Sequence, residues 1–202
     1  MAVKPFSLLL LLAFLASCSS KNILVEGSLP VPMVKKIPAT VGIYYSEEFV
    51  SFRYKEISPE IGNWDIDFGG QNARFFRLLF DSMFEKTENI DRRDISNENS
   101  GGFDGFLIPK IKKYGFLTPF VSGLGFYSAS IEYELSLYDS DASVILTWKV
   151  VGYGKNEGGV FGKEEAIERA TLLAIRDAGA KIAIELGKRA EIESWLKDKM
   201  GG

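Results

Sequence analysis

The clearest pattern along the chain is an alternation of apolar and polar residues in its third quarter. Between Ser130 and Tyr138 the apolar positions are 131, 133, 135 and 137, with two glutamates and a serine between them. The alternation resumes from Val144 to Val150, after five turn-forming residues at 139–143. A period of two is typical of a strand with one buried face. Two such runs around a short turn therefore predict a β-hairpin.

A period close to four predicts a helix that begins near Gln71. Phe76, Phe80 and Phe84 recur every four residues, and the neighbouring rows are filled by other apolar residues: Phe75, Leu79 and Met83. We interpret this Phe75–Phe84 face as core. The alternative is that part of it lines a groove for an acyl chain or a partner segment. Exposed aromatic side chains are expected instead at Trp64 and Phe68, in a glycine-rich stretch.

A second, longer helix is predicted over Lys163–Lys199. Small residues recur along one row of it and would let the helix lie close against a sheet: Ala166, Ala170, Ala174 and Ala178. Gly179 and Gly187 are weak points in this helix, and the alternative is a separate helical turn from Glu191.

Strand-forming residues also occupy 40–45, 49–57 and 103–111. Pro109 within the last of these favours an edge position, because proline cannot donate to a strand ladder. The order of strand, helix, strands and long helix predicts the α+β class. We expect an antiparallel sheet of about four to five strands, with two helices packed on one face and the other face free or partly covered.

The N-terminal segment has the pattern of an export signal. A short basic start, Met1–Lys4, precedes nine apolar residues at 8–16, far fewer than the roughly 20 that span a membrane. Residues 1–17 are therefore interpreted as a signal peptide. The following Leu15-Ala-Ser-Cys18 resembles the lipobox of bacterial lipoproteins. This resemblance implies a lipid anchor at Cys18, with a diacylglycerol on its sulfur and an acyl chain such as palmitate on the new amino terminus.

The residue after the cysteine bears on localisation. In Gram-negative lipoproteins the sorting pattern implies that Ser19, in place of aspartate, directs the protein to the outer membrane, on its periplasmic face. Residues 18–38 are interpreted as the lipidated cysteine and a tether, since they are polar at first and then contain prolines at 30, 32 and 38. The apolar pieces of this segment lie against either the domain or a partner. Residues 39–202 are expected to form a single α+β domain.

Composition excludes several kinds of site. The chain has no histidine and one cysteine, so imidazole or multi-cysteine metal sites and histidine-dependent nucleophiles are excluded. Removing residues 1–17 takes away Lys4 alone, which leaves 23 basic and 27 acidic residues and a formal charge of 23 − 27 = −4. A weakly acidic body gives no footprint for nucleic acid. We expect no catalytic residue, no metal and no cofactor.

Three short motifs are candidates for a functional site. The glycines from Gly152 to Gly158 resemble a dinucleotide fingerprint, but the spacing is one residue too long, so a flexible strand-to-helix turn is favoured. Asp65 and Asp67 lie on one side of an extended segment, and Asp139 and Asp141 do so in the hairpin turn. Two carboxylates are too few for a hard cation. Asp65 and Asp67 could instead serve a carboxylate-dependent enzyme that acts on cell-wall glycan.

The hairpin from Ile131 through Trp148 to Gly152 resembles that of the periplasmic auxiliary lipoproteins of ABC-type transport systems and, more distantly, lipoproteins of lipopolysaccharide assembly. This resemblance implies a non-enzymatic binding or accessory subunit in cell-envelope transport or assembly. We expect the membrane, through the anchor, and an envelope protein as partners, which the sheet face or an edge strand would contact. The alternatives are the glycan enzyme above and a carrier of lipid or another small molecule.

Overall fold

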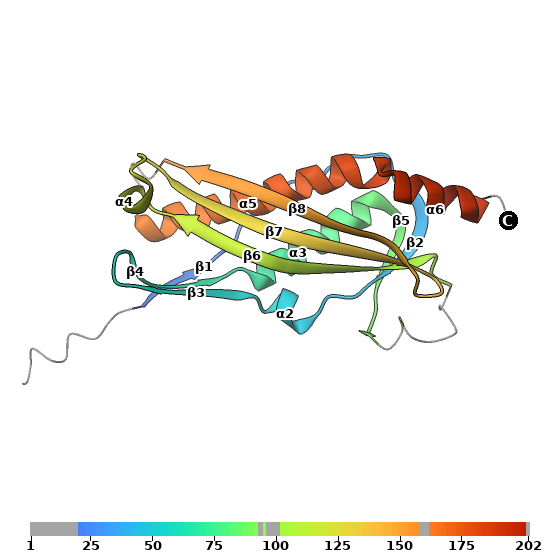
Figure 1. Cartoon of the computed structure of the whole chain (residues 1–202), viewed down its shortest axis with the longest axis horizontal. Coiled ribbons are helices and arrows are strands. Elements are labelled where there is room, and N and C mark those ends of the chain that lie inside the picture. The colour runs from blue at the N-terminus through green and yellow to red at the C-terminus, as the bar shows by residue number, and fades with distance from the viewer. Residues whose placement is uncertain (1–19, 93–94, 96–101, 158–161, 201–202) are drawn as a thin grey trace, which may run out of the picture.

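The computed structural model describes residues 20–92, 95, 102–157 and 162–200. An elongated body carries the start of β1 and the α4 turn at one end and the C-terminal helix at the other (Figure 1). Its strands are β1 (Lys21–Leu24), β2 (Ile37–Ile43), β3 (Arg53–Ser58), β4 (Gly62–Asp67), β5 (Phe84–Asn89), β6 (Gly105–Leu117), β7 (Tyr127–Asp139) and β8 (Val144–Asn156). Its helices are α2 (Glu47–Val50), α3 (Gly69–Met83), α4 (Pro119–Ser122), α5 (Lys163–Glu185), the 3₁₀ turn η2 (Leu186–Lys188) and α6 (Ala190–Met200).

The larger sheet has five strands in the order β5-β2-β6-β7-β8. The helices α3 and α5 lie behind it in the view of Figure 1, which leaves its other face open. This confirms the α+β class, the five-stranded sheet and the helices on one face. The sheet is mixed, however, since β2 runs parallel to both β5 and β6 while β6, β7 and β8 are antiparallel. The chain passes through β3, β4 and α3 between β2 and β5, and so long a crossover allows a parallel pair.

A smaller sheet of order β1-β4-β3 uses residues that the sequence analysis assigned to the tether. β1 pairs in parallel with β4, where Lys21 lies opposite Trp64. Ile23 of this strand and Val25, which follows it, are buried. The tether interpretation is therefore wrong for residues 21–25, because this segment pairs with β4 and buries its alternating apolar side chains. The small sheet also buries Trp64 and Phe68, which are 2% and 0% exposed and not the surface aromatics we expected.

The start of the second expected strand and the position of Pro109 both differ from expectation. Ser46 accepts a hydrogen bond from the Phe49 amide and caps the short helix α2, so β3 begins only at Arg53.

Pro109 lies in β6, in the middle of the sheet order. Its neighbour β2 has ended by then, with the Tyr44 amide donating to the Leu107 carbonyl at 3.0 Å. The missing amide of Pro109 therefore faces a local edge.

The contact between α5 and β8 confirms the role expected of the small residues. Gly152 and Gly154 of β8 face the alanine row of α5, and an added Cβ would lie 2.0 Å from the Ala174 carbonyl oxygen and 1.8 Å from that of Ala170. The two backbones thus meet with no side chain between them. These two glycines lie within a strand and not in a flexible turn, which corrects the interpretation of the glycine-rich motif. Gly158, the last residue of that motif, lies outside the described residues.

The aromatic face of α3 forms the core, as predicted. The Phe76 ring packs on Tyr133 of β7 with centroids 4.8 Å apart, and edge-on to Phe49 at 5.2 Å. Phe76 and Phe80 of α3 are fully buried, and so is Phe84, which the structure places at the start of β5 and not in the helix. Their rings occupy the layer between α3 and the sheet, which is the space that a carrier of lipid or another small molecule would need.

Two buried tyrosines connect the sheet to the helices by hydrogen bonds. The Tyr133 hydroxyl of β7 donates to Asn72 Oδ1 of α3 at 2.5 Å. The Tyr114 hydroxyl of β6 lies 2.7 Å from Thr171 Oγ1, which itself donates to the Ile167 carbonyl of α5. Burial raises the pKa of both tyrosines above the ordinary value of 10, and the hydrogen bonds oppose this only in part. A buried tyrosine hydroxyl therefore joins each of the two helices to the sheet.

The C-terminal segment is divided, as the alternative from Glu191 anticipated. η2 separates α5 from α6, and α6 lies against the hairpin turn at the far end of the sheet. The Trp195 indole donates to Asp139 Oδ1 at 3.3 Å, and the Lys199 ammonium lies 3.3 Å from the same oxygen.

We predict that Gly154→Ala destabilises the protein by at least about 2 kcal/mol, because the new methyl group would collide with the helix backbone, which cannot rotate away. The midpoint of urea unfolding measures this loss. The control is Gly115→Ala in β6, where the nearest atom would be 4.0 Å away and the change should stay within about 0.5 kcal/mol. Equal midpoints for the two variants would contradict the close contact.

A second prediction concerns pH. Between the ordinary tyrosine pKa of 10 and its raised value in the fold, the folded protein holds a proton that the unfolded chain has lost, so stability falls as pH rises above about 10. Tyr133→Phe should cost about 1–3 kcal/mol at neutral pH, since Asn72 loses its partner, and should make the alkaline decline shallower by up to about 1.4 kcal/mol per pH unit. Ile131→Val, equally buried in β7, should lower stability without changing this slope.

Candidate functional site

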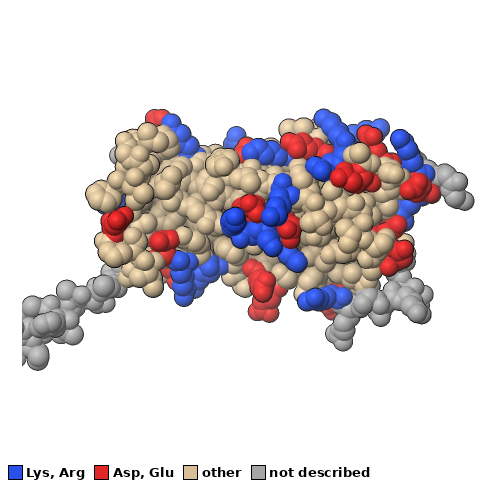
Figure 2. All heavy atoms as spheres, viewed as in Figure 1, with Lys and Arg blue, Asp and Glu red and all other residues tan. Residues whose placement is uncertain are grey.

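The helices leave one face of the five-stranded sheet uncovered (Figure 1). Figure 2 shows this face, with basic and acidic side chains gathered at its middle and uncharged surface on both sides. Lys112 of β6 lies 3.6 Å from Glu134, and Lys149 of β8 lies 3.6 Å from Glu132. These cross-strand ion pairs tie the three antiparallel strands together and divide the open face into two uncharged areas.

The open face is hollowed on each side of these ion pairs. Toward α4 the hollow is about 240 Å³ and is floored by small residues of β6 and β7, with Tyr153 of β8 beside them: Gly115, Ser128 and Ser130. Toward the hairpin turn a larger hollow of about 730 Å³ lies between Tyr44, Ile108 and Tyr138, with Lys110, Glu47 and Arg92 around it. The face can therefore receive apolar side chains at two places on either side of a charged centre.

The β8 edge of the same sheet is occupied by side chains of α5. Asp177 Oδ2 accepts from the Tyr153 amide at 2.9 Å, and the Lys181 ammonium donates to the Val151 carbonyl at 2.7 Å. Partial burial acts against ionisation of Asp177, but the bonds from Lys181 and Tyr153 outweigh it and lower its pKa. Because these backbone groups are already bonded, a partner strand cannot add there without displacing both side chains. The open face is thus a better candidate for contact than the β8 edge.

The two candidate aspartate pairs are engaged in structural contacts. Arg53 of β3 lies 2.8 Å from Asp65 and 3.5 Å from Asp67, across the strand pair β3–β4. The two carboxylates do share one side, as predicted, and this guanidinium lies against both. Partial burial opposes ionisation of Asp139, yet hydrogen bonds from the Ser140 amide, Trp195 and Lys199 lower its pKa. Asp141 accepts from the Ser143 amide in the same turn.

Two further observations apply to the described residues alone. Within residues 20–92, 95, 102–157 and 162–200, no three acidic or metal-ligating side chains are grouped closely enough to hold a metal ion. No helix in this part of the chain is both long enough and apolar enough to cross a bilayer. Cys18, the predicted lipid anchor, and the signal segment 1–17 lie outside the described residues.

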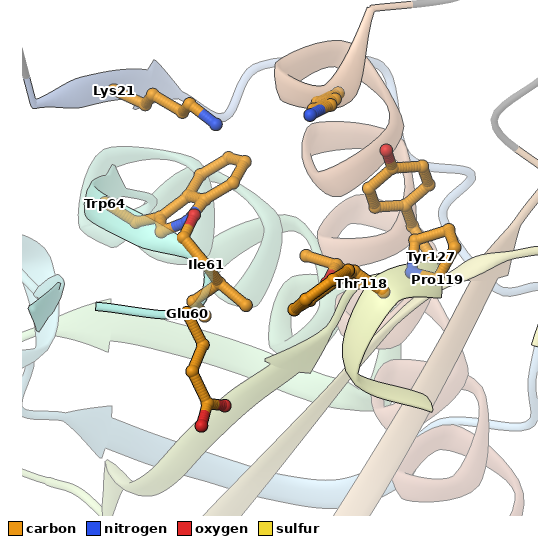
Figure 3. A pocket seen from close by; sticks show the side chains of 9 residues that line it. Lys21, Glu60, Ile61, Trp64, Thr118, Pro119 and Tyr127 are labelled. Atoms are coloured by element: carbon orange, nitrogen blue, oxygen red, sulfur yellow. The ribbon is translucent and has the colours of Figure 1, made fainter. Parts of the chain in front are cut away.

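A pocket of about 320 Å³ lies at the end of the body where β1 begins (Figure 3). Residues from four separate parts of the chain line it: Lys21, Glu60, Ile61, Trp64, Thr118, Pro119, Phe120, Tyr127 and Lys163. The Lys21 ammonium lies over the Trp64 ring, 4.3 Å from its centroid, and the Trp64 indole donates to the Ile61 carbonyl. Figure 3 shows the Glu60 carboxylate pointing away from Lys21.

Sequence reasoning did not find this pocket, because its lining comes together only through the tertiary fold. One signal was available. The stretch from Tyr114 to Ile131 has no charged residue over 18 positions. It contains the α4 turn, and a turn between two strands is ordinarily a place for polar residues.

Comparison with known proteins gives a likeness of fold. No protein-family model matches the sequence, and no curated protein matches it significantly. Among solved structures, a Xanthomonas campestris protein of family DUF330 aligns with a TM-score of 0.54 at 12% identity, over 90% of this chain and 98% of that one. At so low an identity the likeness concerns the fold alone.

Two other solved structures align less closely. A proposed homologue of neuraminyllactose-binding haemagglutinin from Helicobacter pylori has a TM-score of 0.47 at 11% identity, over 86% of this chain and 97% of that one. Lipoprotein GNA1162 from Neisseria meningitidis has a TM-score of 0.30 at 10% identity, over 58% and 84%. The structural neighbours thus include a DUF330 protein and a bacterial lipoprotein.

Proposed function

We propose that this protein is a bacterial lipoprotein, anchored through Cys18 to the periplasmic face of the outer membrane. It serves cell-envelope transport or assembly as a non-enzymatic accessory subunit, and it binds an envelope protein through the open face of its sheet. The observation that carries the proposal is that open face, which is uncovered and is hollowed on each side of its charged centre.

The anchor is supported by the sequence around Cys18. A short apolar segment followed by Leu-Ala-Ser-Cys resembles a lipobox, and the body has no second cysteine with which Cys18 could pair. One acyl chain holds a protein to a bilayer only marginally, whereas several chains together hold it stably. The predicted thioether lipid and N-terminal acyl chain meet that requirement.

Binding through the face rather than through the β8 edge is supported by the contacts at β8. Asp177 and Lys181 occupy the outward backbone groups of Tyr153 and Val151, which a strand-adding partner would need. The open face offers instead the tyrosine-lined hollow beside Tyr138 and the hollow beside Tyr153. Aromatic side chains such as tyrosine are enriched at the centres of protein interfaces.

The competing enzyme would act on cell-wall glycan through Asp65 and Asp67. Both carboxylates contact Arg53, which leaves neither as an isolated acid at a cleft. Their contact with a cation across β3 and β4 supports a role in joining these two strands.

The anchor is tested by mass spectrometry of the protein extracted from bacterial membranes. We expect the mature chain to begin at Cys18 and to carry the mass of three acyl chains with a glyceryl group. Cys18→Ser should abolish this mass and release the protein from the membrane fraction. A membrane-extracted wild-type chain that still begins at Met1 and carries no lipid would contradict the proposal.

The binding face is tested by replacing Thr147, exposed on the open side of β8, with the photo-crosslinker p-benzoylphenylalanine. We expect illumination of intact cells to capture one envelope protein reproducibly, because this position lies beside the charged centre of the face. Ala180, equally small and exposed on α5, is the matched control on the covered side. Equal capture from Thr147 and Ala180 would rule out the open face as the binding surface.

A further inference from the structure

The pocket beside β1 contains two cationic groups without acidic partners. Lys21 and Lys163 both line it, one from β1 and one from the first turn of α5, and neither forms an ion pair in the described part of the chain. Thr118 also lines the pocket and is 7% exposed, yet its buried hydroxyl has no hydrogen-bond partner among the described residues. Two ammonium groups and a free buried hydroxyl form a donor set suited to a small anion.

The backbone at the start of α5 adds to this donor set. Lys163 opens a helix of 23 residues, whose first amides and dipole favour a negative charge. Glu164 and Glu165 of the same turn do not line the pocket. Glu60 does line it, with its carboxylate directed away from Lys21 (Figure 3). The pocket lining therefore carries two ammonium groups against one carboxylate, although the protein as a whole is acidic.

Exposed apolar side chains border the same pocket. We define the apolar tip as Phe120, Val121 and Leu124, which are 78%, 47% and 51% exposed. Phe120 is itself part of the pocket lining, so the tip and the two lysines belong to one surface. Such a cluster beside unpaired cations is typical of a protein surface that meets the interface of a bilayer.

The predicted anchor identifies what covers this surface. Lys21 follows Cys18 by three residues, and three extended residues span at most about 11 Å. An acylated Cys18 therefore holds Lys21 within that distance of the lipid headgroups. The anion available at this depth of a bilayer is the headgroup phosphate.

We propose that this pocket binds the phosphate of a phospholipid between Lys21 and Lys163, while the apolar tip enters the leaflet beside the anchor. The inference rests on the proposed lipid anchor at Cys18. It adds a specific lipid contact, so that the body lies on the membrane in one orientation instead of moving freely on a flexible tether.

The position of the tip is tested with the mature chain, residues 18–202, coupled through its single thiol to a maleimide lipid. The vesicles are phosphatidylethanolamine and phosphatidylglycerol with brominated acyl chains, which quench tryptophan on contact. We expect a Phe120→Trp reporter to be quenched severalfold more than a Val144→Trp reporter. Val144 is similarly exposed, at 62%, and begins β8 at the opposite end of the sheet.

Equal quenching of the two reporters would overturn the proposal. So would a Phe120→Trp reporter that is shielded from aqueous acrylamide but not quenched by brominated lipid, because the tip would then contact protein or a second copy of the chain. The coupling itself supplies the anchor. If cells do not acylate Cys18, the proposed function is therefore wrong. The quenching measurement stays valid in that case, because it does not use the natural anchor.

The phosphate contact is tested with the unlipidated Cys18→Ser mature chain and phosphatidylglycerol vesicles. Lys21→Met combined with Lys163→Met should lower the vesicle association constant by about tenfold or more. The charge-matched control, Lys110→Met with Lys149→Met on the open face, should lower it by less than about twofold. An equal loss in both, or binding abolished by millimolar inorganic phosphate as effectively as by the lysine changes, would refute a lipid-specific pocket.

Discussion

The backbone of α5 lies directly on β8, and the placement of the other elements depends on this contact. It needs glycine on the strand and alanine on the helix together, since an added Cβ at Gly154 would lie 1.8 Å from the Ala170 carbonyl. At this short separation Asp177 and Lys181 reach past the helix to the edge of β8 and bond to its free backbone groups. A larger side chain in the contact would move the helix outward and expose that edge, which is a template for unwanted pairing.

The same contact explains why one face of the sheet stays open. With α5 against β7 and β8, and with α3 held to β7 through Tyr133 and Asn72, both long helices bury their apolar stripes on one side. The opposite side needs no cover, because Lys112–Glu134 and Lys149–Glu132 supply polar groups across its centre. Charged pairs at the middle of an exposed sheet keep it soluble and also limit the approach of a wrong partner, whose own charges would have to match. Recognition through this face can therefore be selective.

Periodicity predicted the elements that pair or pack with near neighbours in sequence. The hairpin of β7 and β8, the aromatic helix α3 and the alanine row of α5 are all visible as patterns of two or four residues. Parallel pairing was not predictable in this way, because β1 meets β4 across some forty residues of sequence and nothing in Lys21–Leu24 specifies its partner. For the same reason Trp64 and Phe68 looked exposed, since their cover comes from distant residues: the Trp64 ring packs on Phe116, and that of Phe68 on Tyr114. The pocket joins Lys21, Thr118 and Lys163, which no local pattern relates.

The short connection from Cys18 to β1 links the two proposals through geometry. Because β1 starts at Lys21, the chain between anchor and body is too short to act as the spacer that its prolines suggested; those prolines lie after β1 instead. With the pocket end on the bilayer, the long axis of the body points away from the membrane, and α6 is at the far end (Figure 1). The strands of the larger sheet then run outward from the membrane surface. The open face of the sheet is then perpendicular to the membrane plane. A partner in the periplasm can reach both hollows of this face without displacing lipid. A long flexible tether would leave the direction of this face undefined, whereas the proposed contact at Lys21, Lys163 and the apolar tip would set it.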